Sequence, residues 1–282
     1  MRRAAAVALL ALVAAGCRRA PPPPVPRPHF VLGAPYQAGG VWRYPREEYG
    51  GSFTGLAVIQ PADHPPLTAD GEAYDPKAME AAHPTLQLPA VARVENLETG
   101  RETVVRINDR GPADPGRVIA VTPRVAALLG MRPDQPARVR VTLLPNESHR
   151  AADDLPGAPR LAIAAAPREP VTVAPLDGTH PAAPIPAPAS APQPVPPLVH
   201  LPESVTQYRP DPGQLFVRLS PFTARRYALR QGQQIGGGTA VEPLAGGLWA
   251  ARLGPFATPA DADAALDRAI RAGVTDARIV VE

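Results

Sequence analysis

Residues 91–107 read VARVENLETGRETVVRI. Residues 91–97 alternate between two faces, Gly100 offers a turn, and residues 104–107 return as a second, mainly apolar run. Alternation with a period of two on either side of a glycine turn predicts a β-hairpin. This hairpin indicates that the surrounding sequence is rich in strands.

The patterned region around the hairpin spans residues 29–144. A short helix is predicted after Thr122, which suits the N-cap position, with Pro123 in its first turn and Gly130 as its stop. Residues 139–143 alternate as a further strand. Short strands with one or two small helices predict a compact β-barrel, so the fold class expected for this region is mainly β.

Proline marks the domain boundaries. It supplies 40 of 282 residues, about 14% against roughly 5% in average usage, and it crowds two segments that lack helical or strand periodicity. We therefore expect a signal peptide at 1–16, a proline-rich tether at 17–28, the barrel at 29–144, a disordered Pro/Ala-rich linker at 145–212 and a second domain at 213–282.

The N-terminus has the pattern of an export signal. Two arginines precede an apolar run over residues 4–15, and small residues lead to Cys17, the only cysteine. A single cysteine excludes an intramolecular disulfide and a cysteine-rich metal site. The segment resembles the lipobox of bacterial lipoproteins, which implies lipidation of Cys17, and Arg18 after it favours the outer membrane. An ordinary signal peptide cleaved nearby is the alternative.

Charge and histidine patterns exclude several function classes. The net charge is +3, and Lys77 is the single lysine, so the glycine-rich phosphate loop with its lysine is absent. Arginines are scattered without interleaved aromatics, which argues against nucleic-acid binding. The six histidines form no HExxH pattern, so we expect neither a catalytic metal nor a cofactor, and we interpret His64 as a loop residue.

The C-terminal block, residues 214–282, has a different layout. Its predicted order is βαββαβ, and residues 218–222 repeat at 252–256, an offset of 252 − 218 = 34. Two such halves make a four-stranded antiparallel sheet with both helices on one face and the other face free for a ligand. Arg218 and Arg252 hold equivalent strand positions and are the candidate ligand-binding residues. Two aromatics, Phe216 and Trp249, are either core residues or platforms for a sugar.

Three further motifs suggest a family. Residues 68–75 read TADGEAYD, residues 81–86 read AAHPTL and residues 105–112 read VRINDRGP. Together they resemble rare lipoprotein A, a family of septal lytic transglycosylases with a double-psi β-barrel, and residues 35–47 resemble the family's entry into that barrel. The C-terminal block resembles a SPOR domain, which binds peptidoglycan strands stripped of stem peptides.

The resemblance implies a catalytic constellation. Glu72 falls where the family carries its essential glutamate, and one carboxyl can serve in turn as acid and base. His83 falls at a functionally required histidine, which would orient the sugar or stabilise developing charge. Alternatively, His83 interacts with the dipole of a helix expected over residues 76–82.

Two aspartates keep alternative roles. Asp75 is either the N-cap of the expected helix or a cleft residue. Asp109 either is itself the acid or raises the pKa of Glu72 by like-charge repulsion, and Arg110 is expected to pair with it as a fold clamp. Two carboxylates would also serve a hydrolase, so the sequence leaves that reaction open.

One segment departs from the family. Residues 57–61 read AVIQP where the family has Ala-Ser-Trp-Tyr-Gly. Two functions are therefore expected to compete: an outer-membrane lipoprotein, facing the periplasm at the septum, that cleaves peptide-free glycan, and a catalytically inactive septal protein that only binds it. The sequence identifies no protein partner.

Overall fold

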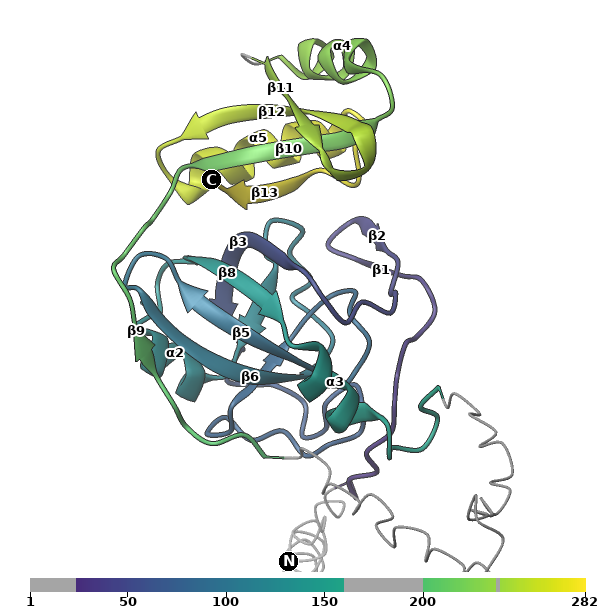
Figure 1. The fold of residues 1–282 in the computed structure, drawn as a ribbon, viewed down its shortest axis with the longest axis vertical. Coiled ribbons are helices and arrows are strands. Elements are labelled where there is room, and N and C mark those ends of the chain that lie inside the picture. The colour runs from purple at the N-terminus through teal and green to yellow at the C-terminus, as the bar shows by residue number, and fades with distance from the viewer. Residues whose placement is uncertain (1–23, 160–199, 237–238) are drawn as a thin grey trace, which may run out of the picture.

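The computed structural model describes residues 24–159, 200–236 and 239–282 of the chain. They form a β-barrel and a smaller α+β domain packed against it (Figure 1). Cys17 and the centre of the proline-rich linker lie outside these residues. Among the described helices, none combines the length and the apolar character needed to cross a bilayer.

The barrel confirms the predicted fold class. Its six strands are β3 (Ser52–Ile59), β4 (Glu80–Ala82), β5 (Ala90–Asn96), β6 (Arg101–Asp109), β7 (Ile119–Val121) and β8 (Ala137–Leu143). They pair in the order β4-β7-β3-β8-β5-β6, and β6 pairs with β4 to close the ring. The β3–β7 and β4–β6 pairs are parallel and the others antiparallel, so the barrel is closed and mixed.

Local sequence explains several of these elements. The predicted hairpin is β5 and β6, and Gly100 adopts the left-handed φ of 70° that its turn requires. In β8, residues alternate between buried and half-buried, which turns one face of the strand into the core. Helix α2 (Pro123–Leu129) is also confirmed, because the Thr122 hydroxyl accepts the Val125 amide and Gly130 ends the helix with a φ of 69°.

The helix expected over residues 76–82 is wrong. Residues 80–82 form strand β4, which pairs with β6 on one side and β7 on the other. All three of its residues are buried. Pairing on both edges satisfies backbone groups that a short local helix would have left open at its ends, so tertiary context overrides local propensity.

The segment expected to start the linker is partly structured. Pro145 begins helix α3 (Pro145–Ala152), in which proline occupies a first-turn position that needs no amide donor. Ser148 bonds the backbone of Val91 on β5 through its hydroxyl at 2.9 Å, and strand β9 (Thr206–Gln207) pairs with β6. Both ends of the expected linker are therefore part of the barrel domain.

The C-terminal domain has the predicted βαββαβ order. Its elements are β10 (Leu215–Phe222), α4 (Arg225–Ile235), β11 (Thr239–Leu244), a 3-10 turn (Ala245–Gly247), β12 (Leu248–Phe256), α5 (Pro259–Arg271) and β13 (Arg278–Val281). The sheet is antiparallel in the order β11-β12-β10-β13. Residues of both helices join one apolar cluster with residues from this sheet.

The two domains contact each other directly, which the expected long linker did not suggest. On β3, the Thr54 hydroxyl donates to the Val281 carbonyl at 2.8 Å and accepts the Val281 amide at 3.0 Å. Arg117 forms a two-pronged ion pair with Asp263 of α5, at 2.6 and 2.8 Å. Leu56 of the barrel is fully buried within the apolar cluster of the C-terminal domain. The interface therefore combines polar and apolar contacts.

A small two-stranded hairpin precedes the barrel in the chain. It consists of β1 (Tyr36–Ala38) and β2 (Val41–Arg43), and in Figure 1 it stands beside the barrel below the C-terminal domain. The Tyr36 hydroxyl donates to the Pro84 carbonyl at 2.8 Å. This bond anchors the hairpin to the loop that follows β4.

Candidate active site

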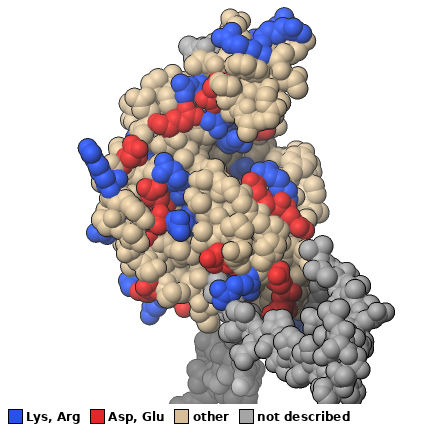
Figure 2. Space-filling model, viewed as in Figure 1, with Lys and Arg blue, Asp and Glu red and all other residues tan. Residues whose placement is uncertain are grey.

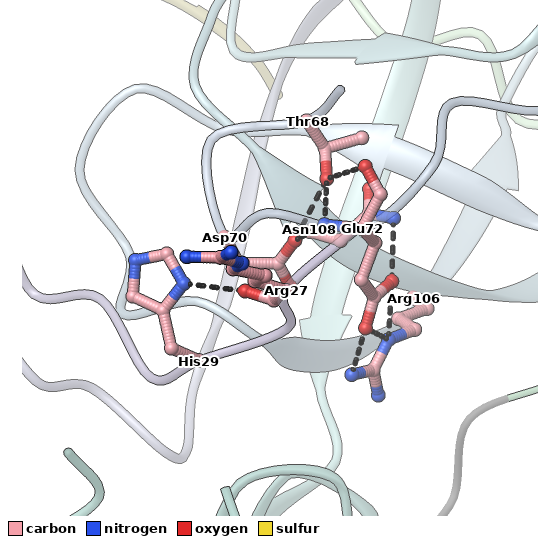
Figure 3. A network of polar contacts seen from close by, with 7 residues as sticks. All are labelled: Arg27, His29, Thr68, Asp70, Glu72, Arg106 and Asn108. Carbon is pink, nitrogen blue, oxygen red and sulfur yellow. Dashed lines mark hydrogen bonds and ion pairs between the residues drawn. The ribbon is translucent and has the colours of Figure 1, made fainter. Parts of the chain in front are cut away.

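The loop that carries Glu72 is tightly folded. Thr68 donates through its hydroxyl to Asp70 at 2.7 Å, and the Glu72 amide donates back to the Thr68 hydroxyl at 3.1 Å (Figure 3). Gly71 has a φ of 83°, and a side chain there would collide with the Arg27 carbonyl at 2.3 Å. Glycine at this position thus lets the N-terminal segment lie across the loop.

The Glu72 carboxylate lies in a buried ion pair. Arg106 donates to it from Nε and Nη2, the shortest bond being 2.6 Å, and Asn108 Nδ2 donates at 2.9 Å. The exposed fractions of the Glu72 and Arg106 side chains are 10% and 2%. Arg106 and Asn108 lie two residues apart on β6, so both donors point to the same side of that strand. This arrangement matches an ionised carboxylate, which only accepts hydrogen bonds.

Two more carboxyl groups lie near this ion pair. Burial, reinforced by the Glu72 charge, raises the pKa of Asp70 to about 7. Burial also raises the pKa of Glu80 to about 7, against the hydrogen bond from Asn108. One oxygen of each group is buried and has no hydrogen-bond partner among the residues that the structure describes. Near neutral pH, the site therefore holds one paired anion and two carboxyls able to keep a proton.

Asp109 belongs to a neighbouring cluster. Its Oδ1 accepts the Ala69 amide at 2.7 Å, and its Oδ2 is 2.7 Å from His64 Nε2. The other ring nitrogen of His64 faces the Pro65 carbonyl at 2.7 Å. Tyr74 stacks on this ring with centroids 3.9 Å apart. The structure thus gives His64 a specific partner, which a sequence lacking any histidine motif did not indicate.

Arg110 does not clamp Asp109. Its guanidinium donates to backbone carbonyls, including Leu86 and, at 2.6 Å, Leu32. The ion pair expected between Arg110 and Asp109 therefore does not form.

His83 follows β4 and is buried. Its Nδ1 accepts the amides of Thr85 and Leu86, each at 3.1 Å, which leaves the ring proton on Nε2. Burial and the charges of nearby arginines lower the pKa of His83 to about 3. The backbone amide of His83 donates to the Asp109 carbonyl at 3.0 Å. His83 is therefore a neutral hydrogen-bond donor next to Asp109, and its interaction with a helix end is ruled out because no helix forms there.

Asp75 caps a turn. Its Oδ1 accepts the Lys77 amide at 2.8 Å, and its carbonyl accepts the Ala78 amide at 3.0 Å. It also lines a small hollow of about 190 Å³ together with Glu80 and Arg106. Both roles expected for Asp75, capping and cleft residue, are thus compatible with its position, although the cap belongs to a turn instead of a helix.

The segment that departs from the family lies at the end of β3. Its residues 57–59 pair in parallel with β7, and the Gln60 amide donates to the Val121 carbonyl at 2.8 Å. Gln60 is 5% exposed, and its Oε1 has no hydrogen-bond partner in the described part of the chain. Aliphatic residues here continue the barrel strand, so the substitution preserves the fold.

The two C-terminal candidates lie side by side. Arg218 and Arg252 are register partners on β10 and β12. Both pair with Glu242 and Glu282, and the Arg252 guanidinium lies 4.4 Å from the centre of the Phe216 ring. The repeat therefore brings the two arginines together, but acidic partners occupy them.

Comparisons with known proteins match the barrel. A family profile described as lytic transglycolase matches residues 53–142, which include all four predicted catalytic positions. The endolytic peptidoglycan transglycosylase RlpA of Yersinia pestis is 58% identical over 60 residues, covering 21% of this chain and 16% of that protein. RlpA of Escherichia coli K12 is 54% identical over 77 residues, covering 27% and 21%. RlpA of Pseudomonas aeruginosa PAO1 is 39% identical over 134 residues, covering 43% and 36%. Among these three relatives, the chain matches at most 36% of the relative's length.

Proposed function

We propose that the protein is an endolytic peptidoglycan transglycosylase, because its barrel is similar in sequence to that of the rare lipoprotein A family. The proposed substrate is the peptide-free glycan strand. The C6 hydroxyl of N-acetylmuramic acid attacks C1 of the same sugar, the bond to N-acetylglucosamine breaks, and a 1,6-anhydro end forms without consuming water. A base takes the hydroxyl proton, and an acid protonates the leaving oxygen.

One observation carries this proposal: the two sequence motifs meet in space. The Asp70 amide donates to the Asn108 carbonyl at 3.2 Å, and the Ala69 amide donates to the Asp109 carboxylate at 2.7 Å. Asn108 in turn binds Glu72. The loop with the glutamate is therefore tied to the strand end with the aspartate, which supplies two carboxylates in one neighbourhood.

The surroundings of each residue suit it to a different catalytic role. Glu72, held as an anion by Arg106 and Asn108, suits the base that takes the C6 hydroxyl proton. In the single acid/base scheme the same carboxyl starts protonated, gives its proton to the leaving oxygen as the C1–O bond breaks, and then, as an anion, takes the C6 hydroxyl proton. Asp109 with His64 is the competing acid/base pair. Neutral His83 supplies a hydrogen-bond donor for a sugar oxygen that gains negative charge.

Digestion of purified peptide-free glycan, with mass spectrometry of the products, tests the proposal. Wild-type protein is expected to release fragments with 1,6-anhydromuramic ends. Loss of at least about 100-fold in rate, within the usual range for general acid–base catalysis, is expected for whichever of Glu72→Gln and Asp109→Asn removes the acid/base. The exposed carboxyl of Glu98 offers the matched control, and Glu98→Gln should digest at the wild-type rate. Equal activity in all variants would refute the assignment.

A second candidate function is binding without turnover. Val58, Ile59 and Gln60 stand where the family resemblance places a serine and two aromatics, so any sugar contacts of those side chains would be missing. The same digestion decides between the two functions. Strands that stay intact at high protein concentration, yet are retained by the protein, would favour the inactive binder.

The proposal extends to location. Lipidation of Cys17 would hold the barrel on the periplasmic side of the outer membrane, and the C-terminal domain would enrich the protein at the septum by binding peptide-free strands. Labelling with a radioactive fatty acid should mark the wild-type protein and not Cys17→Ala. Deleting residues 214–282 should abolish midcell enrichment, and unchanged enrichment would refute the septal role.

A further inference from the structure

A cleft lies between the barrel and the C-terminal domain, beside the contacts that join them. Its volume is about 690 Å³, and its walls come from β2, β3, the loop after β4, and β13 with the turn before it. Figure 2 shows basic side chains on both sides of this hollow. Because His83 lines it on the barrel side, the cleft reaches one of the predicted catalytic residues.

The cleft has a surplus of positive charge. Its lining includes two acidic residues, Glu48 and Asp276, and six arginines: Arg43, Arg46, Arg117, Arg140, Arg218 and Arg278. Four of these arginines already form ion pairs with Glu48, Asp263, Glu95 and, for Arg218, Glu242 and Glu282. The other two lining arginines are Arg43 and Arg278.

Arg43 and Arg278 form no ion pair with an acidic side chain among the described residues. Nε and Nη2 of Arg43 are buried and have no hydrogen-bond partner there. Leaving a buried charged donor unsatisfied costs free energy, so such a group is expected at a place where a ligand supplies the acceptor. Arg278, on β13, faces the same cleft from the other domain.

Exposed aromatics stand at the barrel side of the cleft. Trp42 and Tyr44 line it and are 54% and 62% exposed. Aromatic faces of this kind pack against the apolar C–H faces of sugar rings, while the polar edge of the ring stays in water. The hydrogen bond from Tyr36 to Pro84 anchors the hairpin on which Trp42 lies.

We infer that this cleft binds an acidic saccharide chain, with Arg43 and Arg278 as the carboxylate-binding residues and Trp42 and Tyr44 as the sugar platforms. The inference rests on the proposed function, since a glycan strand free of peptides carries a lactyl carboxylate on every muramic acid. One glycan strand would then contact both domains at once. The packed domain interface would hold the glycan strand against His83.

Binding of purified peptide-free glycan to the full-length protein tests this inference. Titration calorimetry in the Glu72→Gln/Asp109→Asn background avoids turnover, whichever of the two carboxyls is the acid/base. The double variant Arg43→Ala/Arg278→Ala is expected to weaken binding at least about tenfold, as loss of hydrogen bonds to charged groups does. Arg271→Ala is the matched control, because Arg271 ends α5 and does not line the cleft. Glycan whose carboxyls have been esterified should bind all of these proteins alike.

The outcomes separate the inference from the proposed function. Equal affinity of the double variant and the control for the charged glycan would overturn the cleft assignment, even if the wild-type protein cleaves the strand. A charge-dependent loss of binding with no cleavage by wild-type protein would support the cleft and refute the activity. Trp42→Ala should weaken binding of charged and esterified glycan together, and no change in either would remove the platform role.

Discussion

Replacing Asp70 by asparagine is expected to flatten the pH dependence of the protein's stability. Asp70 is fully buried, and one of its oxygens accepts bonds from Thr68 and from the Glu72 amide. Asparagine keeps that oxygen as an acceptor and removes the titrating group. The variant therefore isolates the cost of ionising a carboxyl beside Glu72.

The direction follows from the pKa of Asp70, which rises from 3.8 to about 7 on folding. Between these two values the folded chain holds a proton that the unfolded chain has released, so the free energy of unfolding falls as the pH rises through this window and levels off above about pH 7. Between pH 5 and about pH 7 the folded Asp70 keeps a proton that the unfolded chain has lost. The free energy of unfolding therefore falls by about 3 kcal/mol, at 1.36 kcal/mol per pH unit over about two units.

Urea unfolding at pH 5 and pH 8 measures this difference. The wild-type protein should lose about 3 kcal/mol more than Asp70→Asn between the two pH values. Asp134→Asn is the matched control, because Asp134 is 64% exposed and should behave like the wild type. Equal slopes for wild type and Asp70→Asn would contradict the raised pKa and, with it, the buried acidic cluster.

Three further perturbations test other parts of the structure. The ring of His83, whose pKa lies at about 3, should show no titration above pH 5 in nuclear magnetic resonance spectra, and a midpoint near pH 6.5 would exclude the neutral donor. Arg117→Asp should cost about 2 kcal/mol of stability and expose the domain junction to protease, whereas adding Asp263→Arg should restore both, and a double variant no better than the single one would remove that ion pair from the interface. Thr122→Ala should cost about 1 kcal/mol in urea unfolding, because the hydroxyl caps α2 and donates to the Ala78 carbonyl at 2.8 Å; a neutral effect would count against the cap.

Local signals in the sequence were sufficient for much of the fold. The β5–β6 hairpin, α2 and the βαββαβ order all follow from short-range periodicity, caps and glycine stops, which act within a few residues. The error at residues 76–82 has the opposite origin. Strand β4 is defined by its two partners, β6 and β7, and no local pattern identifies a strand whose stability comes from both neighbours.

The candidate site shows the same division. The motifs identified Glu72, His83 and Asp109, but the partners of these residues come from distant positions. His64 reaches Asp109 across 45 residues, and Arg106 reaches Glu72 across 34. The domain interface joins Thr54 to Val281 across 227 residues. Contacts at such separations depend on the closed barrel and on the packing of the two domains, and a single sequence carries no signal for them.

Digestion of peptide-free glycan in water enriched in oxygen-18 tests the central claim most directly. In the proposed reaction the C6 hydroxyl of muramic acid, and not water, attacks C1. The account predicts fragments with 1,6-anhydromuramic ends that contain no oxygen-18. Fragments with labelled reducing ends, or strands left intact by the wild-type protein, would contradict it.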